Sequence, residues 1–304
     1  MSHFKLIRYQ NLMLIALMQV FIKYGLFHPF GIDITLSNFN FALLVLATLC
    51  IAAAGNIIND IYDVSIDNIN KPEQVLIGKK ISEKSAFTFF IILNVIGVGI
   101  GFYLSSNIGK PEFASIFIVI SALLYLYASY LKSMFIIGNI VISTLVASSL
   151  IIVGLFDLLP AITPENLATQ STIFSIVLDY ALFAFLINLI REIVKDIQDM
   201  DGDKNGGMNT IPIVLGRKRA NYIVFSLGIL ALFIVVYFTY TYLYHKQLAV
   251  LYFLLLIVAP LIYFCVKVFS AQYQKEFSFL SKLLKLIMFF GMCSILIYQY
   301  VILK

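Results

Sequence analysis

Long apolar runs alternate with short polar breaks along the whole chain. Each run has roughly the 20 residues that an α-helix needs to cross about 30 Å of hydrocarbon. The breaks contain Gly, Pro, Asn and charged residues, as turns between helices require. The pattern predicts about nine membrane-spanning helices, near residues 10–28, 41–62, 85–106, 113–131, 135–158, 172–196, 219–243, 247–269 and 283–303. We therefore expect an all-α bundle that forms a single transmembrane domain over residues 1–304.

Composition supports a membrane environment. Apolar residues make up 61% of the chain and charged residues 12%, against roughly 25% charged in a typical globular domain. The mean hydropathy is +0.97. The first apolar run follows Lys5 and Arg8 but has no small-residue cleavage site, so we expect it to be retained as a helix. The three cysteines lie inside apolar runs at unrelated spacings, which favours packing over a disulfide framework or a metal site.

Basic residues are distributed asymmetrically among the predicted loops, and this distribution predicts an orientation. With the N-terminus in the cytoplasm, 17 of the 21 Lys and Arg residues fall on the cytoplasmic side, three fall outside, and Lys23 lies within the first span. The three on the outside are Lys110, Lys246 and Lys304. By the positive-inside rule, we expect an odd number of spans in the cell (inner) membrane and a cytoplasmic N-terminus. The net charge of +5 then reflects topology rather than binding to nucleic acid.

The second predicted span ends in an unusual polar stretch, "NIINDIYDVSIDNINKP", residues 56–72. At about 100° per residue on a helix, Asn56, Asp60, Asp63 and Asp67 share an arc of about 60°. These four oxygen-bearing side chains therefore form one polar stripe.

A matching stripe closes the sixth predicted span, in "REIVKDIQDMDGDKNGG", residues 191–207. Asp196, Asp199 and Asp203 repeat the i, i+3, i+7 spacing, and Glu192 takes the position that Asn56 holds in the first stripe. Both stripes lie at the predicted cytoplasmic ends of their helices. They could therefore face each other across the bundle.

Polar helix ends are often simply solvated, but two matching acidic stripes on one side of the membrane favour a metal site. Converging carboxylates repel one another and raise each other's pKa values unless a cation compensates their charge. Mg²⁺ prefers oxygen ligands and commonly binds through a few carboxylates together with substrate phosphates. The pattern predicts two halves of a site for a magnesium-bound pyrophosphate.

Basic residues close to the stripes fit a phosphate ligand. Each of them could also be a topological anchor. They are Lys71, Lys79 and Lys80 after the first stripe, and Arg191, Lys195 and Lys204 around the second. Lys71 and Lys132 are the strongest candidates, because Lys71 directly follows a stripe and Lys132 is an isolated cation at the end of the fourth span.

These motifs resemble those of the UbiA-type intramembrane prenyltransferases. "NDIYDVSID", residues 59–67, matches the family's N-D-x-x-D-x-x-x-D signature, and "DIQDMDGD", residues 196–203, is similar to its second D-x-x-D-x-x-x-D motif. The resemblance extends to "RYQN", "NKPEQVLIGKKIS", "LKSMFIIGN" and "MNTIPIVLG". It implies nine helices around a central cavity that opens to the bilayer, with a polar cap on the cytoplasmic side. It also implies Mg²⁺-dependent transfer of a prenyl chain from its diphosphate to a lipophilic acceptor.

Residue by residue, the resemblance assigns the candidate catalytic and binding positions. The candidate metal ligands are Asn59, Asp60, Asp63, Asp67, Asp196, Asp199 and Asp203, and the six aspartates among them are the candidate catalytic residues. The candidate substrate-binding residues are Asn11, Asn56, Asn59, Lys71, Tyr125, Tyr127, Lys132, Arg191 and Lys195. Many family members carry a tyrosine four residues before the fourth-helix lysine, whereas this chain has Ala128 there. Tyr125 and Tyr127 are then alternative partners for the substrate.

The acceptor stays open at this stage. The second motif looks most like the branch that alkylates a hydroxyl of geranylgeranylglyceryl phosphate, but branches that prenylate 4-hydroxybenzoate or dihydroxynaphthoate share the same metal motifs. The implied partners are a polyprenyl diphosphate, an acceptor and the lipid bilayer, with no nucleic acid and no obligate protein partner. An ion-coupled transporter is the alternative from another class, since intramembrane carboxylates often mark ion pathways.

Overall fold

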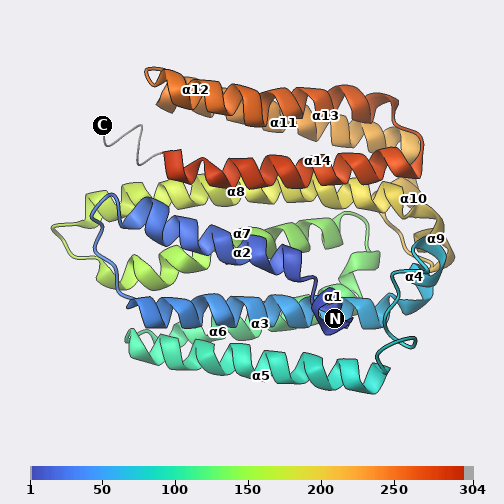
Figure 1. Ribbon diagram of the computed structural model, residues 1–304, viewed down its shortest axis with the longest axis horizontal. Coiled ribbons are helices and arrows are strands. Elements are labelled where there is room, and N and C mark those ends of the chain that lie inside the picture. The colour runs from blue at the N-terminus through green and yellow to red at the C-terminus, as the bar shows by residue number, and fades with distance from the viewer. Residues whose placement is uncertain (1, 298–304) are drawn as a thin grey trace.

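A computed structural model describes residues 2–297 of the chain, and this part is almost entirely helical (Figure 1). Within it, nine helical segments are long and apolar enough to cross a membrane. They are α2 with the π-helical η1 (Tyr9–Val20 and Phe21–Phe27), α3 (Asn38–Tyr62), α5 (Glu83–Asn107), η2 with α6 (Pro111–Phe113 and Ala114–Ser129), α7 with η4 (Ile137–Asp157 and Leu159–Ala161), α8 (Leu167–Gln198), α11 (Arg217–Leu243), α12 with η5 and α13 (Gln247–Phe253, Leu254–Val258 and Ala259–Ser270), and α14 (Gln274–Cys293). The predicted all-α membrane fold is confirmed.

The ninth span begins earlier than the sequence pattern predicts. The apolar run suggested residues 283–303, but α14 starts at Gln274, where Tyr273 and Glu276 form a capping box. The charged residues of the first turns are part of the helix, and Glu276 accepts from the backbone amides of Gln272 and Tyr273 at 2.8 Å. Residues 298–303 of the predicted span lie outside the described residues. The sixth span also begins earlier than predicted, at Leu167 instead of residue 172.

Six of the spans form a ring. Helix α2 packs against α3 and α7, and α6 also packs against both of these helices. Helix α8 lies between α7 and α14, and the hydrogen bond from Lys285 to Asn11 links α14 back to α2. Helix α5 covers the outside of α3 and α6, and α11 and α13 cover α8 and α14, as Figure 1 shows.

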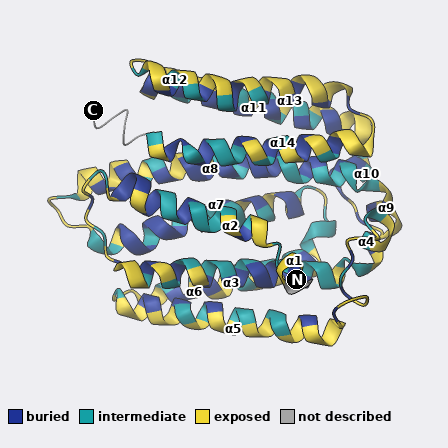
Figure 2. Ribbon diagram, in the orientation of Figure 1, coloured by how far each residue is buried: buried dark blue, intermediate teal, exposed yellow. Residues whose placement is uncertain are grey.

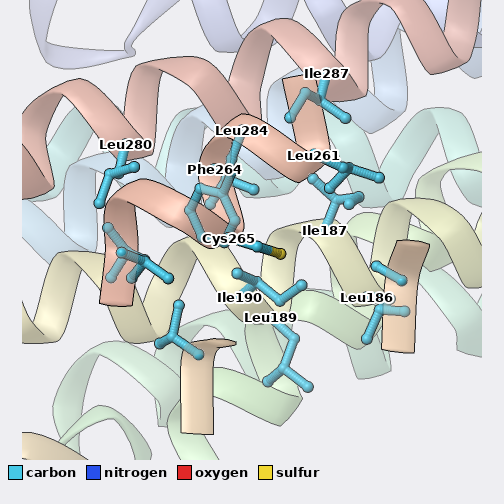
Figure 3. Close-up of a cluster of buried hydrophobic side chains, with 14 of the residues drawn as sticks. Leu186, Ile187, Leu189, Ile190, Leu261, Phe264, Cys265, Leu280, Leu284 and Ile287 are labelled. Carbon is cyan, nitrogen blue, oxygen red and sulfur yellow. The ribbon is translucent and has the colours of Figure 1, made fainter. Parts of the chain in front are cut away.

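The largest buried cluster lies where α8, α13 and α14 meet (Figure 3). Ile187 and Ile190 of α8 point there toward Phe264 of α13 and Leu284 of α14. The outer helices expose large apolar side chains instead, including Leu248 at 78% (Figure 2). Such a surface is stable against lipid, where apolar side chains need no burial inside the protein. The chain is therefore an integral multi-pass membrane protein.

One end of the ring is closed by a fully buried ion pair. Lys23 of η1 and Asp157 of α7 are both 0% exposed, and Lys23 Nζ lies 3.1 Å from Asp157 Oδ2. Lys23 also donates to the carbonyl oxygen of Leu36, and the amide of Leu36 donates to Asp157 Oδ1 at 2.8 Å. Every charge in this group has a partner, so the contact fixes α2, α7 and the segment before α3 together.

Candidate functional site

The two acidic motifs lie at the other end of the ring, at the right in Figure 1, and each spans a break in its helix. Helix α3 ends at Tyr62, and a short helix, α4 (Val64–Asn70), begins after Asp63. In the same way α8 ends at Gln198, and α9 (Met200–Asn205) begins after Asp199. The backbone departs from ideal helical geometry at the middle aspartate, with ψ of −1° at Asp63 and 10° at Asp199. The amide of Asp67 still donates to the carbonyl oxygen of Asp63, and the amide of Asp203 to that of Asp199, so helical hydrogen bonding continues across both breaks.

The breaks bring the two motifs together, since α4 packs against α9. Asn70 holds the start of α9: its Nδ2 donates to the carbonyl oxygen of Asp199 at 2.9 Å, and its Oδ1 accepts from the amide of Gly202 at 2.9 Å. A Cβ at Gly202 would lie 2.4 Å from Asn70 Nδ2. Only glycine therefore allows this close approach of the two motifs.

Lysines connect the aspartates of different elements. Lys71, directly after α4, forms an ion pair with Asp199 at the start of α9. Lys132, in the 3₁₀ turn η3 (Leu131–Ser133), forms an ion pair with Asp63, whose Oδ2 also accepts from Asn59 Nδ2 at 2.7 Å. The two lysines chosen from sequence as the strongest candidates thus contact the middle aspartate of each motif.

The first aspartate of each motif has a partner of another kind. Arg8 donates to Asp60 at 2.6 Å, and Asn139 of α7 donates to Asp196 at 2.8 Å. Arg8 has a φ of 54°, a left-handed conformation that is uncommon for a residue with a side chain. Strain of this kind persists only where surrounding contacts maintain it.

The last aspartate of each motif has a raised pKa, because it is buried close to other carboxylates. Burial, together with the negative charge of Asp63, raises the pKa of Asp67 to about 6. Burial and the charges of Asp199 and Asp63 raise the pKa of Asp203 to about 7. The four carboxylates therefore act on one another, as expected for motifs that share a site.

The donor set fits a hard divalent cation that is shared with a ligand. Oδ1 of Asp199 is buried and has no hydrogen-bond partner among the described residues, so one carboxylate oxygen is available. In the same part of the chain, no three His, Cys, Asp or Glu side chains surround a single point. The geometry is thus not a closed protein cage, and it suits Mg²⁺, which usually keeps positions for water and substrate phosphates.

The remaining predicted residues divide between this site and other contacts. Tyr127 is partly buried and close enough to Asp63, Glu192 and Asp196 to interact with their charges. Tyr125 instead is 39% exposed and shares a hydrogen bond with the hydroxyl of Tyr62 at 3.2 Å.

Three other predicted residues bind neighbours rather than the aspartates. Asn56 donates to the carbonyl oxygen of Ile7, which ties the N-terminal segment to α3. Arg191 and Lys195 both contact Glu192, at 3.1 Å and 2.9 Å.

Sequence reasoning missed Arg8, Asn139 and Lys285 as parts of this region. Arg8 and Asn139 lie within the quoted stretches "RYQN" and "LKSMFIIGN", so the resemblance contained a signal for both. Lys285 had no signal, because its partner Asn11 is 274 positions away.

The chain matches a family of known proteins. Residues 13–293 match the model of the UbiA prenyltransferase family. A digeranylgeranylglyceryl phosphate synthase of Korarchaeum cryptofilum is 35% identical over 261 residues, which cover 84% of this chain and 85% of that protein. Another from Thermococcus kodakarensis is 36% identical over 181 residues, or 60% of this chain, and the match spans only 58% of that protein's length.

Solved structures share the fold. A digeranylgeranylglyceryl phosphate synthase structure is 27% identical, with a TM-score of 0.64 over 98% of this chain and 97% of its own. A UbiA homologue of Archaeoglobus fulgidus, bound to GPP and Mg²⁺, is 14% identical, with a TM-score of 0.61 over 97% of this chain and 99% of its own.

Proposed function

The chain belongs to the UbiA prenyltransferase family, and from this we propose that it transfers a geranylgeranyl group from its diphosphate to geranylgeranylglyceryl phosphate, with Mg²⁺ as cofactor. One observation carries the proposal: two aspartate motifs from distant parts of the chain lie together, Lys71 beside the first motif pairs with Asp199 of the second, and Lys132 pairs with Asp63 of the first. Diphosphate binding needs this combination of metal-binding oxygens and cations.

The aspartates and Asn59 would hold the metal. Candidate ligands are Asn59, Asp60, Asp63, Asp67, Asp196, Asp199 and Asp203. A structure of a related protein contains GPP and Mg²⁺. Bound Mg²⁺ supplies positive charge next to the phosphate oxygens.

Lys71 and Lys132 are placed to neutralise the leaving group. With a diphosphate present, their ammonium groups can exchange a carboxylate partner for phosphate oxygens. The allylic C–O bond breaks, its electron pair stays on the diphosphate, and the lysines stabilise the charge that develops there. Apolar walls and aromatic rings such as that of Tyr127 shield the allylic cation until the glycerol hydroxyl attacks it and loses its proton.

The membrane explains why the charged site lies at one end of the helix bundle. A prenyl tail that stays in hydrocarbon can reach a charged headgroup site only at the end of a helix bundle. We place that end at the cytoplasmic face of the inner membrane, because the loops beside it carry most of the Lys and Arg residues. Reporter tags at the N- and C-termini test this orientation, since an odd number of spans puts them on opposite sides.

The acceptor is proposed from the relatives, which are digeranylgeranylglyceryl phosphate synthases. The test uses the full chain, purified in detergent, with Mg²⁺ and radiolabelled geranylgeranyl diphosphate. Geranylgeranylglyceryl phosphate and dihydroxynaphthoate are offered in parallel. Labelled ether lipid, absent when Mg²⁺ is chelated, is the expected result.

A prenylated ring without ether lipid would overturn the acceptor assignment and leave prenyl transfer intact. The absence of any product would overturn the proposal as a whole. Since catalysis needs no sealed membrane, product formation in detergent also separates an enzyme from an ion-coupled transporter.

A further inference from the structure

A second group of cations lies beside the aspartate motifs but does not bind them in the way that Lys71 and Lys132 do. It consists of Arg191 and Lys195 of α8 and Lys285 of α14, and we call it the basic cluster. Arg191 is close enough to Lys285 and to Lys195 for their like charges to interact. Elements from the middle and the end of the chain therefore bring three positive charges together.

The protein compensates only part of this charge. Glu192 accepts from Arg191 at 3.1 Å and from Lys195 at 2.9 Å. The next carboxylate, Asp196, interacts with the charge of Lys195 but accepts its hydrogen bond from Asn139. Among the described residues, Lys285 has only the neutral amide oxygen of Asn11 as a partner, at 2.8 Å, so its charge is available to an anionic ligand.

The basic cluster also has an unused donor. The Arg191 side chain is 17% exposed, and its Nε is buried without a hydrogen-bond partner among the described residues. A guanidinium presents five N–H donors in a planar fork that matches phosphate geometry. An unpaired buried donor is costly, so a ligand that accepts from it gains more than it would at a water-exposed arginine.

Tyr127 is close enough to Glu192 and to Asp63 to interact with both charges. The two groups of cations have different partners. Lys71 and Lys132 belong to the aspartates, whereas Arg191, Lys195 and Lys285 surround Glu192 and Asn11.

We propose that the basic cluster binds the phosphate of the acceptor lipid, while the aspartates and their lysines bind the diphosphate of the prenyl donor. The inference rests on the proposed function, because it assumes an acceptor with a phosphate headgroup. It assigns Arg191 and Lys195 to the acceptor instead of the donor, and it adds Lys285 as a residue that determines acceptor specificity.

Steady-state kinetics of Lys285→Gln, with each substrate varied in turn, tests this division. Loss of one charge-assisted hydrogen bond should raise the KM for geranylgeranylglyceryl phosphate about tenfold. The KM for geranylgeranyl diphosphate should stay within about twofold of wild type, because a rim charge that does not touch a ligand contributes little. Lys282→Gln is the matched control, since Lys282 is an exposed lysine one turn earlier on the same helix. A raised donor KM with an unchanged acceptor KM would overturn the inference.

Acceptor analogues sharpen the test. Wild type should prefer the phosphate-bearing lipid over geranylgeranylglycerol, and Lys285→Gln and Arg191→Gln should lose most of that preference. Equal preference in wild type and variants would refute the assignment.

Calorimetric titration of the purified protein with the phosphate lipid, without donor, gives a readout that does not need turnover. Weaker binding in Lys285→Gln supports the inference even if no ether lipid forms, and in that case only the proposed reaction fails. Inorganic phosphate that binds as tightly as the lipid would assign the cluster to free phosphate and overturn the lipid assignment. No binding of the phosphate lipid by wild type would overturn it as well.

Discussion

The two ends of the helix ring both contain lysine–aspartate pairs, but the pairs differ in what surrounds them. At one end, Lys23 and Asp157 are completely buried, and backbone groups of Leu36 satisfy both of them. At the other end, the side chains of Lys71 and Asp199 are 29% and 18% exposed, and one oxygen of Asp199 has no partner. The first pair is complete and holds helices together. The second is incomplete, and its partners can be exchanged for a ligand.

The largest expected effect follows from removing an aspartate at the incomplete end. Asp199→Ala should reduce turnover by roughly a thousandfold, because both the metal and Lys71 lose a partner at the diphosphate. Prenyl transfer in detergent measures this loss, and the melting temperature should change little. Robust activity of Asp199→Ala would refute the metal assignment. Asp63→Ala should behave in the same way.

Breaking the complete pair should instead affect stability. Asp157→Ala leaves the buried ammonium of Lys23 unpaired, which should lower the free energy of unfolding by about 3 kcal/mol. Thermal unfolding in detergent measures the change. The double variant Lys23→Met, Asp157→Leu should recover much of it, since it removes both charges. A KM for the prenyl donor that rises in Asp157→Ala would contradict the purely structural role of this end.

The contact between the two motifs gives a smaller effect on catalysis. Gly202→Ala should displace Asn70 and shift α4 against α9. Activity should fall by about tenfold, as it does when residues that position metal ligands are replaced. Gly99→Ala on α5 is the control, because a Cβ there meets no other atom within 4 Å. Equal activity of the two variants would show that the close approach of α4 and α9 does not position the motifs.

The smallest effect separates the two tyrosines. Tyr127→Phe should lower activity several-fold, because its hydroxyl is close enough to Glu192 and Asp196 to interact with their charges. Tyr125→Phe should stay within about twofold of wild type, since an exposed hydrogen bond to Tyr62 contributes little. Parallel assays of the two variants decide the point, and a larger loss in Tyr125→Phe would reverse the assignment.

The membrane-spanning helices could be predicted because their signal is local. A helix in lipid satisfies its own backbone hydrogen bonds, so about 20 apolar residues are sufficient to identify it. The error at the ninth span has the same origin, since Lys275, Glu276 and Lys282 indicate a loop by composition although they lie in the first turns of α14. The aspartates of the site could also be identified from the sequence, because their spacing repeats within a few residues.

Other features could not be read from the chain. The break at Asp63 and Asp199 depends on how α4 and α9 pack, and the position of Tyr127 rather than Tyr125 beside the acidic residues depends on the rotation of α6. Both are set by contacts with segments far away in sequence.

By itself, the sequence determined that the chain lies in a membrane, how many spans it has and what chemistry the two acidic motifs offer. Hydrophobicity and the spacing of carboxylates are properties of a few neighbouring residues. Only the tertiary structure decided which cation serves which anion. Lys71 and Lys132 meet the aspartates, whereas Lys285 meets Asn11 across 274 positions and joins Arg191. The physical reason is that charge interactions depend on distances in space, and these distances exist only after the helices have packed into a ring.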